Sequence, residues 1–441
     1  LRNMQFFRMY FTEFDTTKVF RFVQMEYGRN LWRKFDRVEE ISTGGLSLTP
    51  LPTAELSVSA VNIEEHGDRN PFNYVIPNGI VRERIQSFQQ QLQQNEQSLS
   101  LDVSNFHPTQ GVGIFKELFL DLRRYKRLKL MSHLENKDPM VEIKDKEDIS
   151  LFIRLGSDYT NNYYEYEVPL TYSDTSAIKG LQPASREYKD EVWNPENEID
   201  LDLRTLIDLK RTRNNNELSL EEIFSIIDPN DPDSLRTFRI KGNPNLGYVK
   251  GIMIGLRNIS DDPNPKHVDV WVNELRVTGL DERGGMAALA QVEAQLADFG
   301  NLALSGRHST IGYGDLDQKV NQRSLEDNTV MDASINLELG KFFKEESGIR
   351  IPFYAQFNQE ITTPEFDPYD LDVKLDDKIS DADDRTARDS ISEQAKEITT
   401  IKSFNFTNVR KERTGGKKSM PWDVENLTAS YAYTETDQTD P

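Results

Sequence analysis

The sequence contains no cysteine and only five histidines in 441 residues. Without cysteine the chain has no disulfide scaffold, no thiolate zinc site and no thiol nucleophile. It also lacks any apolar run near the ~20 residues that a membrane-spanning helix needs; a typical apolar stretch is Gly251–Leu256. A disulfide-stapled domain and a helical membrane protein are therefore excluded. A transmembrane β-barrel is not, because its alternating strands average to a low hydropathy, and the mean hydropathy here is −0.65.

Positive charge is scarce as well: 53 Lys and Arg face 74 Asp and Glu, which gives a net charge of −21. Nucleic acid is thereby excluded as the main partner, because phosphate binding needs a basic surface. The sequence has no GxSxG, HExxH, Walker or Rossmann motif. Its histidines are scattered without an i, i+4 pair and are interpreted as ordinary core or surface residues. We therefore expect no enzymatic activity, no cofactor and no catalytic residue.

The first two-thirds of the chain, residues 1–279, is predicted to be mostly β, a jelly-roll-like or sandwich unit with a few short helices. Short segments rich in β-branched and aromatic residues are typical of strands. Such segments are Phe20–Tyr27, Leu128–Leu134, Ser150–Leu155, Tyr163–Val168 and His267–Val277. Apolar residues at helical spacing predict a helix over Val81–Gln97. A capping box at Ser219–Glu222 predicts the start of another helix.

The pattern changes near Gly284 and Gly285. Residues 280–441 contain segments in which apolar or small residues alternate with polar ones, over 286–296, 331–339, 349–361 and 427–434. Strands of about ten such residues can cross a bilayer in an antiparallel barrel, with one face toward lipid and one toward a wet lumen. The predicted lipid-facing residues are Val292, Leu296, Ile335, Leu337, Ile351 and Phe353. The predicted lumen-facing residues are Gln291, Glu293, Asn336, Glu338, Gln356 and Asn358.

A water-soluble sheet with one face on a core alternates equally well. Two features favour the barrel. Four alternating segments occur in one stretch, and the connections between them are unequal. Residues 296–301 allow only a tight turn, whereas residues 308–328 and 364–398 are long and charged; outer-membrane barrels combine short turns on one side with long loops on the other. Within the last connection an Asp-rich stretch precedes a short helix predicted over Arg385–Glu397.

Long stretches of the chain resemble the SprA/Sov family. The sharpest are residues 270–306 (VWVNELRVTGLDERGGMAALAQVEAQLADFGNLALSG), 315–343, 347–373 and 401–411 (IKSFNFTNVRK). Residues 118–135, 153–170 and 238–258 are similar to the same family less sharply. The likeness covers most of the chain from about Leu118 onward.

The resemblance implies a portion of a very large outer-membrane β-barrel protein of a Gram-negative bacterium of the Bacteroidetes. Such proteins form the translocon of the type IX secretion system, through which folded cargo leaves the periplasm, and they serve gliding motility. The implied partners are exported cargo proteins, accessory plug or gating subunits, and the lipid bilayer. Because family members are far longer, we expect this chain to be an internal piece of a longer protein.

Two other functions stay open from the residues. A cell-surface carbohydrate-binding or adhesin module is one, because Tyr159, Tyr163, Tyr164 and Tyr166 could stack on sugar rings. Packing of Tyr164 and Tyr166 into a core is the favoured interpretation, since both point to one side of a strand. A jelly-roll glycosidase is the other. The 74 acidic residues supply too many carboxylate pairs to choose a catalytic one.

Two loops carry weaker signals. The best candidates for metal ligands are Asp228, Asp231 and Asp233, because they place several carboxylate oxygens close together and hard metal ions prefer oxygen ligands. Their loop lacks the glycine and glutamate of an EF-hand and holds two prolines, so an ordinary acidic turn is favoured. A basic stretch at residues 410–418 fits either a loop near lipid headgroups or a plain hairpin tip. Trp422, with Tyr431 and Tyr433, fits an interfacial aromatic girdle or simple sheet aromatics.

Overall fold

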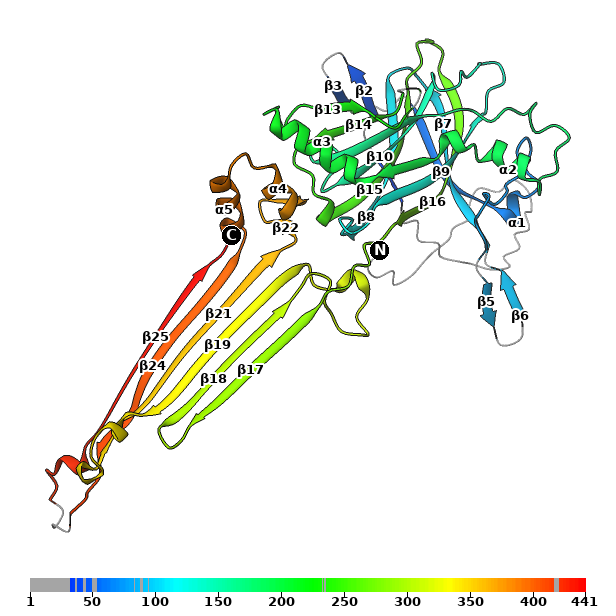
Figure 1. The fold of residues 1–441 in the computed structure, drawn as a ribbon. Coiled ribbons are helices and arrows are strands. Elements are labelled where there is room, and N and C mark those ends of the chain that lie inside the picture. The colour runs from blue at the N-terminus through cyan, green and yellow to red at the C-terminus, as the bar shows by residue number, and fades with distance from the viewer. Residues whose placement is uncertain are drawn as a thin grey trace, which may run out of the picture.

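The protein is mostly β, and its sheets are antiparallel. The computed structural model describes residues 32–35, 38–42, 45–49, 54–82, 84–87, 90–93, 95–231, 233, 235–415 and 420–441. The strand predicted over Phe20–Tyr27 lies outside these residues. Figure 1 shows two parts: a sandwich of two packed sheets, and a long third sheet that extends away from it.

Two sheets form the sandwich. In spatial order the first contains β13 (Phe224–Ile227), β14 (Thr237–Lys241), β11 (Tyr163–Pro169), β10 (Ile149–Gly156), β15 (Val249–Asn258), β8 (Gln110–Leu120), β2 (Val38–Ser42) and β3 (Gly45–Thr49), with β1 (Arg33–Lys34) also paired to β8. The second contains β12 (Ile199–Asp202), β9 (Arg127–Asn136), β16 (Lys266–Thr278), β7 (Gln97–Phe106) and β4 (Glu55–Asn62). The four strands predicted within residues 128–277 are confirmed.

The main core lies between these two sheets. Alternate residues of β10 and β15, such as Leu151 and Ile254, face alternate residues of β16 and β9, such as Val270 and Leu134, and all four are buried. Burial of an aliphatic side chain contributes roughly 1.5–3 kcal/mol. The opposite side of β16 is buried too, because Trp271 packs with Tyr74, Trp193 and Phe72 in a second cluster.

Helices are few, as predicted, but two of the three predicted ones are wrong. The helices are α1 (Ile63–His66), α2 (Arg186–Val192), α3 (Leu203–Asn215), α4 (Leu375–Asp381) and α5 (Arg385–Gln394). The 3-10 turns are η1 (Pro195–Asn197), η2 (Leu246–Tyr248), η3 (Val320–Gln322), η4 (Leu339–Phe342), η5 (Glu345–Ser347) and η6 (Val424–Asn426). No helix among the described residues is long and apolar enough to cross a bilayer. The helix predicted at Arg385 is confirmed as α5, and Asp384 caps it.

The two wrong helix predictions share a physical cause. Among the described residues of the range 81–97, β5 (Arg84–Ser87) and β6 (Gln90–Gln93) pair antiparallel, and β7 begins at Gln97. After the Ser219 capping box the chain enters β13, which pairs with β14. In both places cross-strand hydrogen bonds replace those of a helix, so tertiary pairing overrides a local periodicity of only one or two turns.

The third sheet is built from long strands. In spatial order it contains β17 (Ala287–Leu296), β18 (Gly300–Ser309), β19 (Glu326–Glu338), β21 (Pro352–Pro364) and β24 (Glu397–Lys411), with the short β20 (Ile349–Arg350) and β25 (Thr428–Thr439) also paired to β24. The four alternating segments predicted from the sequence all lie on these strands. The connection between β21 and β24 contains the hairpin β22 (Phe366–Asp367) and β23 (Asp370–Lys374) followed by α4 and α5, at the end of the sheet nearest the sandwich (Figure 1).

Candidate functional site

The register of the third sheet gives it two chemically different faces. Cross-strand neighbours form rows on one side or the other. One row runs Val292, Leu304, Ala333 and Phe357, and ends in the charged pair Lys402 and Glu435. The next two rows on that side are Ala294, Leu302, Ile335, Ala355, Phe404 and Tyr433, and Leu296, Gly300, Leu337, Phe353, Phe406 and Tyr431. We call this side the apolar face.

Nothing in the described part of the chain covers the apolar face. Val292 is 58% exposed, Leu304 41% and Tyr431 56%. Between Val272 and Phe366, and along β24 and β25, the described residues include no buried apolar side chain. A contiguous exposed apolar surface of this size marks a surface that contacts another molecule or a membrane.

The apolar face becomes polar toward the sandwich. Lys402 of β24 pairs with Glu435 of β25 on this face, and the following row ends at Asp437. His308 of β18 lies opposite Thr329 one row further along. The two rows nearest the hairpin end are therefore apolar throughout, and the third is apolar from β17 to β21 and ends in Lys402 and Glu435 on β24 and β25. Further charged residues follow toward the sandwich.

The opposite side, which we call the polar face, carries carboxamides and hydroxyls. Its row nearest the hairpin end is Gln295, Asn301, Asn336, Tyr354 and Asn405. The next two rows are Glu293, Ala303, Ser334, Gln356, Ser403 and Thr434, and Gln291, Ser305, Asp332, Asn358, Ile401 and Thr436. Ile401 is the apolar member of the last row. Five predicted lumen-facing residues, Gln291, Glu293, Asn336, Gln356 and Asn358, share this face, and five predicted lipid-facing residues, Val292, Leu296, Ile335, Leu337 and Phe353, share the apolar one.

Two predicted residues lie at a strand end instead. The Glu338 carboxylate accepts hydrogen bonds from the backbone N–H of Gly340 at 3.3 Å and of Ile351 at 2.7 Å. Glu338 therefore caps the end of β19, and Ile351 lies at the break between β20 and β21. Neither role was visible in the alternation of the sequence, because a cap depends on where the strand stops.

Aromatic side chains gather at the hairpin end. The Phe353 and Phe406 rings lie 5.0 Å apart and the Phe404 and Tyr433 rings 5.4 Å apart, measured between centroids. Trp422, in the turn between β24 and β25, is 78% exposed. Such edge-exposed aromatics have one apolar side and, in Tyr and Trp, one polar group, which suits a boundary between an apolar medium and water.

A buried polar cluster fastens the third sheet to the sandwich. The Asp372 carboxylate of β23 accepts hydrogen bonds from the Tyr164 hydroxyl at 2.7 Å, the Leu246 backbone N–H at 2.5 Å and Lys210 Nζ at 3.1 Å. Lys210, on α3, is itself buried and also pairs with Asp370 at 2.8 Å. We call these five residues the clasp. A buried charge in such a cluster is stabilised only while its partners stay in place.

Replacing the central carboxylate should weaken the clasp. Asp372→Asn leaves Lys210 buried with Asp370 as its only carboxylate, and we expect a loss of about 3 kcal/mol in the free energy of unfolding, as for a buried ion pair that loses one partner. Faster proteolysis within residues 365–396 should accompany it. Asp376→Asn, an exposed change on the same insert, is the control; equal effects of both changes would show that the clasp contributes nothing.

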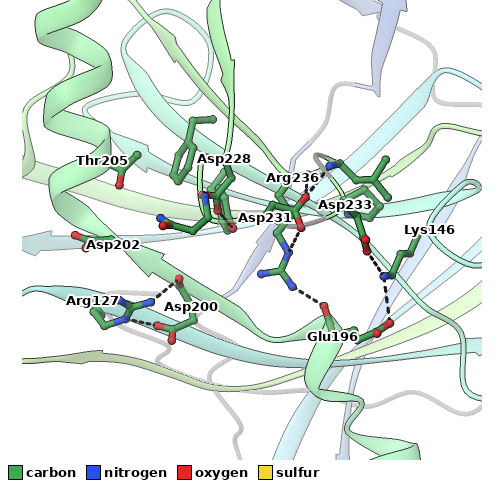
Figure 2. Close-up of a pocket in the computed structure, with 15 residues that line it drawn as sticks. Arg127, Lys146, Glu196, Asp200, Asp202, Thr205, Asp228, Asp231, Asp233 and Arg236 are labelled. Atoms are coloured by element: carbon green, nitrogen blue, oxygen red, sulfur yellow. Dashed lines mark hydrogen bonds and ion pairs between the residues drawn. The ribbon is translucent and has the colours of Figure 1, made fainter.

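The candidate metal loop lines a pocket of about 450 Å³ in the sandwich, shown in Figure 2. Its three carboxylates have separate partners. Asp228 accepts from the Tyr166 hydroxyl at 2.7 Å, Asp231 from the backbone N–H of Leu235 and Arg236, and Asp233 pairs with Lys146 at 2.7 Å. In the ranges that the structure describes, no group of acidic or histidine side chains has metal-binding geometry. The ordinary acidic loop favoured by the sequence fits this arrangement.

The first sheet contains a buried ionic cluster that the sequence did not indicate. Glu165 pairs with Arg154 at 2.5 Å, Arg257 at 2.9 Å and Arg239 at 2.8 Å. Burial alone would raise the pKa of Glu165, but the three guanidinium groups outweigh burial and hold it well below its ordinary value. Glu165 therefore stays charged in the folded chain and joins β11 to β10, β14 and β15.

The tyrosines of β11 and one histidine lie in the core of the sandwich. Tyr164 and Tyr166 are each 1% exposed, so neither ring can stack on a sugar. His133 is fully buried between Trp271 and Phe72. Its Nδ1–H donates to the Val192 carbonyl at 2.8 Å, and burial lowers its pKa to about 4. His133 is thus a neutral structural residue.

Acid should destabilise the sandwich through His133. The unfolded histidine takes up a proton below its ordinary pKa of about 6.5, whereas the folded one does so only near 4. Unfolding therefore becomes easier as pH falls from 6.5 to 4, by about 3 kcal/mol in total. Urea unfolding followed by tryptophan fluorescence should show this slope, and His133→Asn should flatten it. His308→Asn, an exposed change, should not; an unaltered slope in His133→Asn would contradict the assignment.

Fold and surfaces together define an antiparallel β protein that joins a sandwich to an amphipathic sheet with one uncovered apolar face. A family model, SprA_N, described as motility related/secretion protein, matches residues 1–379. The chain therefore belongs to this family of motility-related secretion proteins. The match includes the first hundred residues, where the likeness seen in the sequence was less distinct. No curated protein matches the sequence.

Proposed function

We propose that this chain is part of an outer-membrane channel that exports folded cargo proteins, as in type IX secretion and gliding motility. The observation that carries the proposal is the apolar face of the third sheet, which nothing in the described chain covers and which lies back to back with a polar face. Only a closed antiparallel sheet satisfies its backbone groups within lipid while it separates hydrocarbon from water.

Strand dimensions support a wall that spans a bilayer. The five long strands from β17 to β24 contain between 10 and 15 residues, and β25 contains 12. A tilted barrel strand needs about 9–11 residues to cross the hydrocarbon. The two outermost strands, β17 and β25, have no further strand beside them in the described residues. Open edges of this length must pair with additional strands before the sheet can lie in lipid.

The polar face supports the role of a passage. Asn301 and Asn336 lie in one row with Gln295 and Asn405. Carboxamides both donate and accept hydrogen bonds and carry no charge. This row therefore keeps a layer of water and offers a passing protein hydrogen bonds without charge. The rows beside it add the carboxylates Glu293 and Asp332. Transport of a folded protein forms and breaks no covalent bond, so the proposal includes no catalytic residue and no cofactor.

The arrangement of the sandwich supports a role at one mouth of the channel. The clasp and the insert β22–α5 attach it to one end of the wall (Figure 1). A rigid sandwich at that place can narrow the opening or bind an accessory subunit. We propose exported cargo proteins, plug or gating subunits and the outer-membrane bilayer as the partners, in a Gram-negative envelope.

A lysine scan of β19 tests the wall. Ile335 and Asn336 are neighbours on one strand but belong to opposite faces. If the apolar face meets hydrocarbon, Ile335→Lys near the midplane should cost about 2–4 kcal/mol in the free energy of unfolding in lipid vesicles. Asn336→Lys should cost well under 1 kcal/mol because the added charge stays in water. Equal tolerance of lysine at both positions would refute the lipid-facing assignment.

Fractionation of the full-length protein gives a second test. We expect it in the outer-membrane fraction, extractable only with detergent, and migrating differently on gels before and after heating, as closed barrels do. Recovery of the full-length protein from the aqueous fraction would contradict the channel. Glycan binding by that aqueous material would instead support the carbohydrate-binding alternative.

A further inference from the structure

A second pocket, of about 380 Å³, lies where the first turn of α3 meets β22, β23 and α4. Asp372 of the clasp forms part of its wall. The remaining wall includes six apolar or aromatic side chains, namely Leu122, Tyr125, Leu203, Ile207, Leu246 and Phe366. Ligand pockets combine such walls with a few well-placed polar groups. We call this site the junction pocket.

Basic side chains outnumber acidic ones in the junction pocket, whereas acidic residues outnumber basic ones in the whole chain. It is lined by six basic side chains, Arg123, Arg124, Lys126, Arg204, Arg211 and Lys374, and by five aspartates. The pocket of Figure 2 has three basic and six acidic side chains, in keeping with a net charge of −21. There, Arg127 pairs with Asp200, Lys146 with Asp233, and Arg236 with Asp231.

The aspartates of the junction pocket are mostly engaged elsewhere. Asp202 caps α3, Asp281 pairs with Arg283, and Asp372 holds Lys210. Asp208 pairs with Arg211, which is itself one of the six basic residues. Of the other basic residues, Arg123 pairs with Asp121 and Lys374 with Glu365. In the described ranges, Lys126 and Arg204 are exposed and form no ion pair.

Arg124 is the unusual member. It is only 8% exposed, and its guanidinium donates to two carbonyl oxygens, of Val320 at 2.6 Å and of Asp281 at 3.2 Å. No carboxylate of the described residues lies within ion-pair distance of it. A buried cation without a counter-charge is costly. An anion in the junction pocket would remove that cost, and a guanidinium binds phosphate oxygens with fixed geometry.

We infer that the junction pocket binds an amphiphile whose phosphate group pairs with Arg124, Lys126 and Arg204 while its alkyl chain packs against Tyr125 and Ile207, the two half-buried apolar side chains of the lining. The choice of an amphiphile rests on the proposed function, because a chain inserted in a bilayer meets lipid phosphates at its surface. Bound at this junction, the ligand bridges α3 of the sandwich and the β22–α4 insert of the sheet. It therefore strengthens the attachment that the clasp makes.

Calorimetric titration of the whole chain tests the inference. Octyl phosphate is the probe, and inorganic phosphate and the uncharged octyl glucoside are its two comparisons. All are used below their micelle concentrations, with the full-length protein in a non-ionic detergent that carries no phosphate. We expect octyl phosphate to bind one site at least tenfold more tightly than either comparison. Lys126→Gln and Arg204→Gln, both exposed changes, should each weaken binding three- to tenfold. Lys179→Gln, an exposed lysine near α2, should leave it unchanged.

Any one of three results would overturn the inference. The first is that inorganic phosphate binds as tightly as octyl phosphate, which would make the pocket a plain anion site, and the second is that octyl glucoside does so. The third is that Lys126→Gln and Arg204→Gln both leave the affinity for octyl phosphate unchanged. The titration does not depend on the channel. If the chain proves water-soluble, the same measurement is made in buffer, and specific binding of octyl phosphate there supports the pocket while the channel fails.

Discussion

The main physical constraint on this protein is the apolar face that its own described residues leave uncovered. A soluble sheet of this size buries one side against helices or a second sheet, as the sandwich sheets do here. The strands from β17 to β25 have no such cover, yet they pair in regular register over ten to fifteen residues. The hydrophobic effect therefore requires an external apolar medium or partner, and the polar reverse face requires water. The channel wall proposed above meets both requirements.

The same constraint explains how the chain divides its polar groups. The sandwich builds an ordinary core between its sheets and buries some of its ionic groups in paired clusters, such as Glu165 with its three arginines. Where the insert of the third sheet meets the sandwich, the contacts are polar and buried. Asp372 accepts hydrogen bonds from Tyr164 of β11, from the backbone N–H of Leu246 in η2 and from Lys210 of α3. A polar seam of this kind is directional, so it orients the sandwich over one end of the sheet more strictly than an apolar contact would.

Much of the fold could be predicted from the sequence because strand alternation is a local property. Ile335 and Asn336 belong to opposite faces whatever the rest of the chain does, since consecutive side chains of a strand point to opposite sides. The segment Val81–Gln97 shows where local reasoning fails. Its apolar residues fit a helical period, but hydrogen bonds to a neighbouring strand decided its structure. Glu338 follows the alternation of its strand, but its carboxylate also accepts hydrogen bonds from backbone N–H groups beyond the strand end, which no period along the strand can indicate.

The sequence by itself determined the β class, the two faces of the long strands and the absence of recognisable catalytic motifs, since each follows from residue type and spacing along one segment. Only the tertiary structure decided which distant residues meet. Tyr164 and Asp372 are separated by 208 positions, and Arg124 reaches the carbonyl of Val320 across 196. Such contacts arise from the packing of whole sheets, which no local period encodes. The clasp and the junction pocket are for that reason properties of the fold.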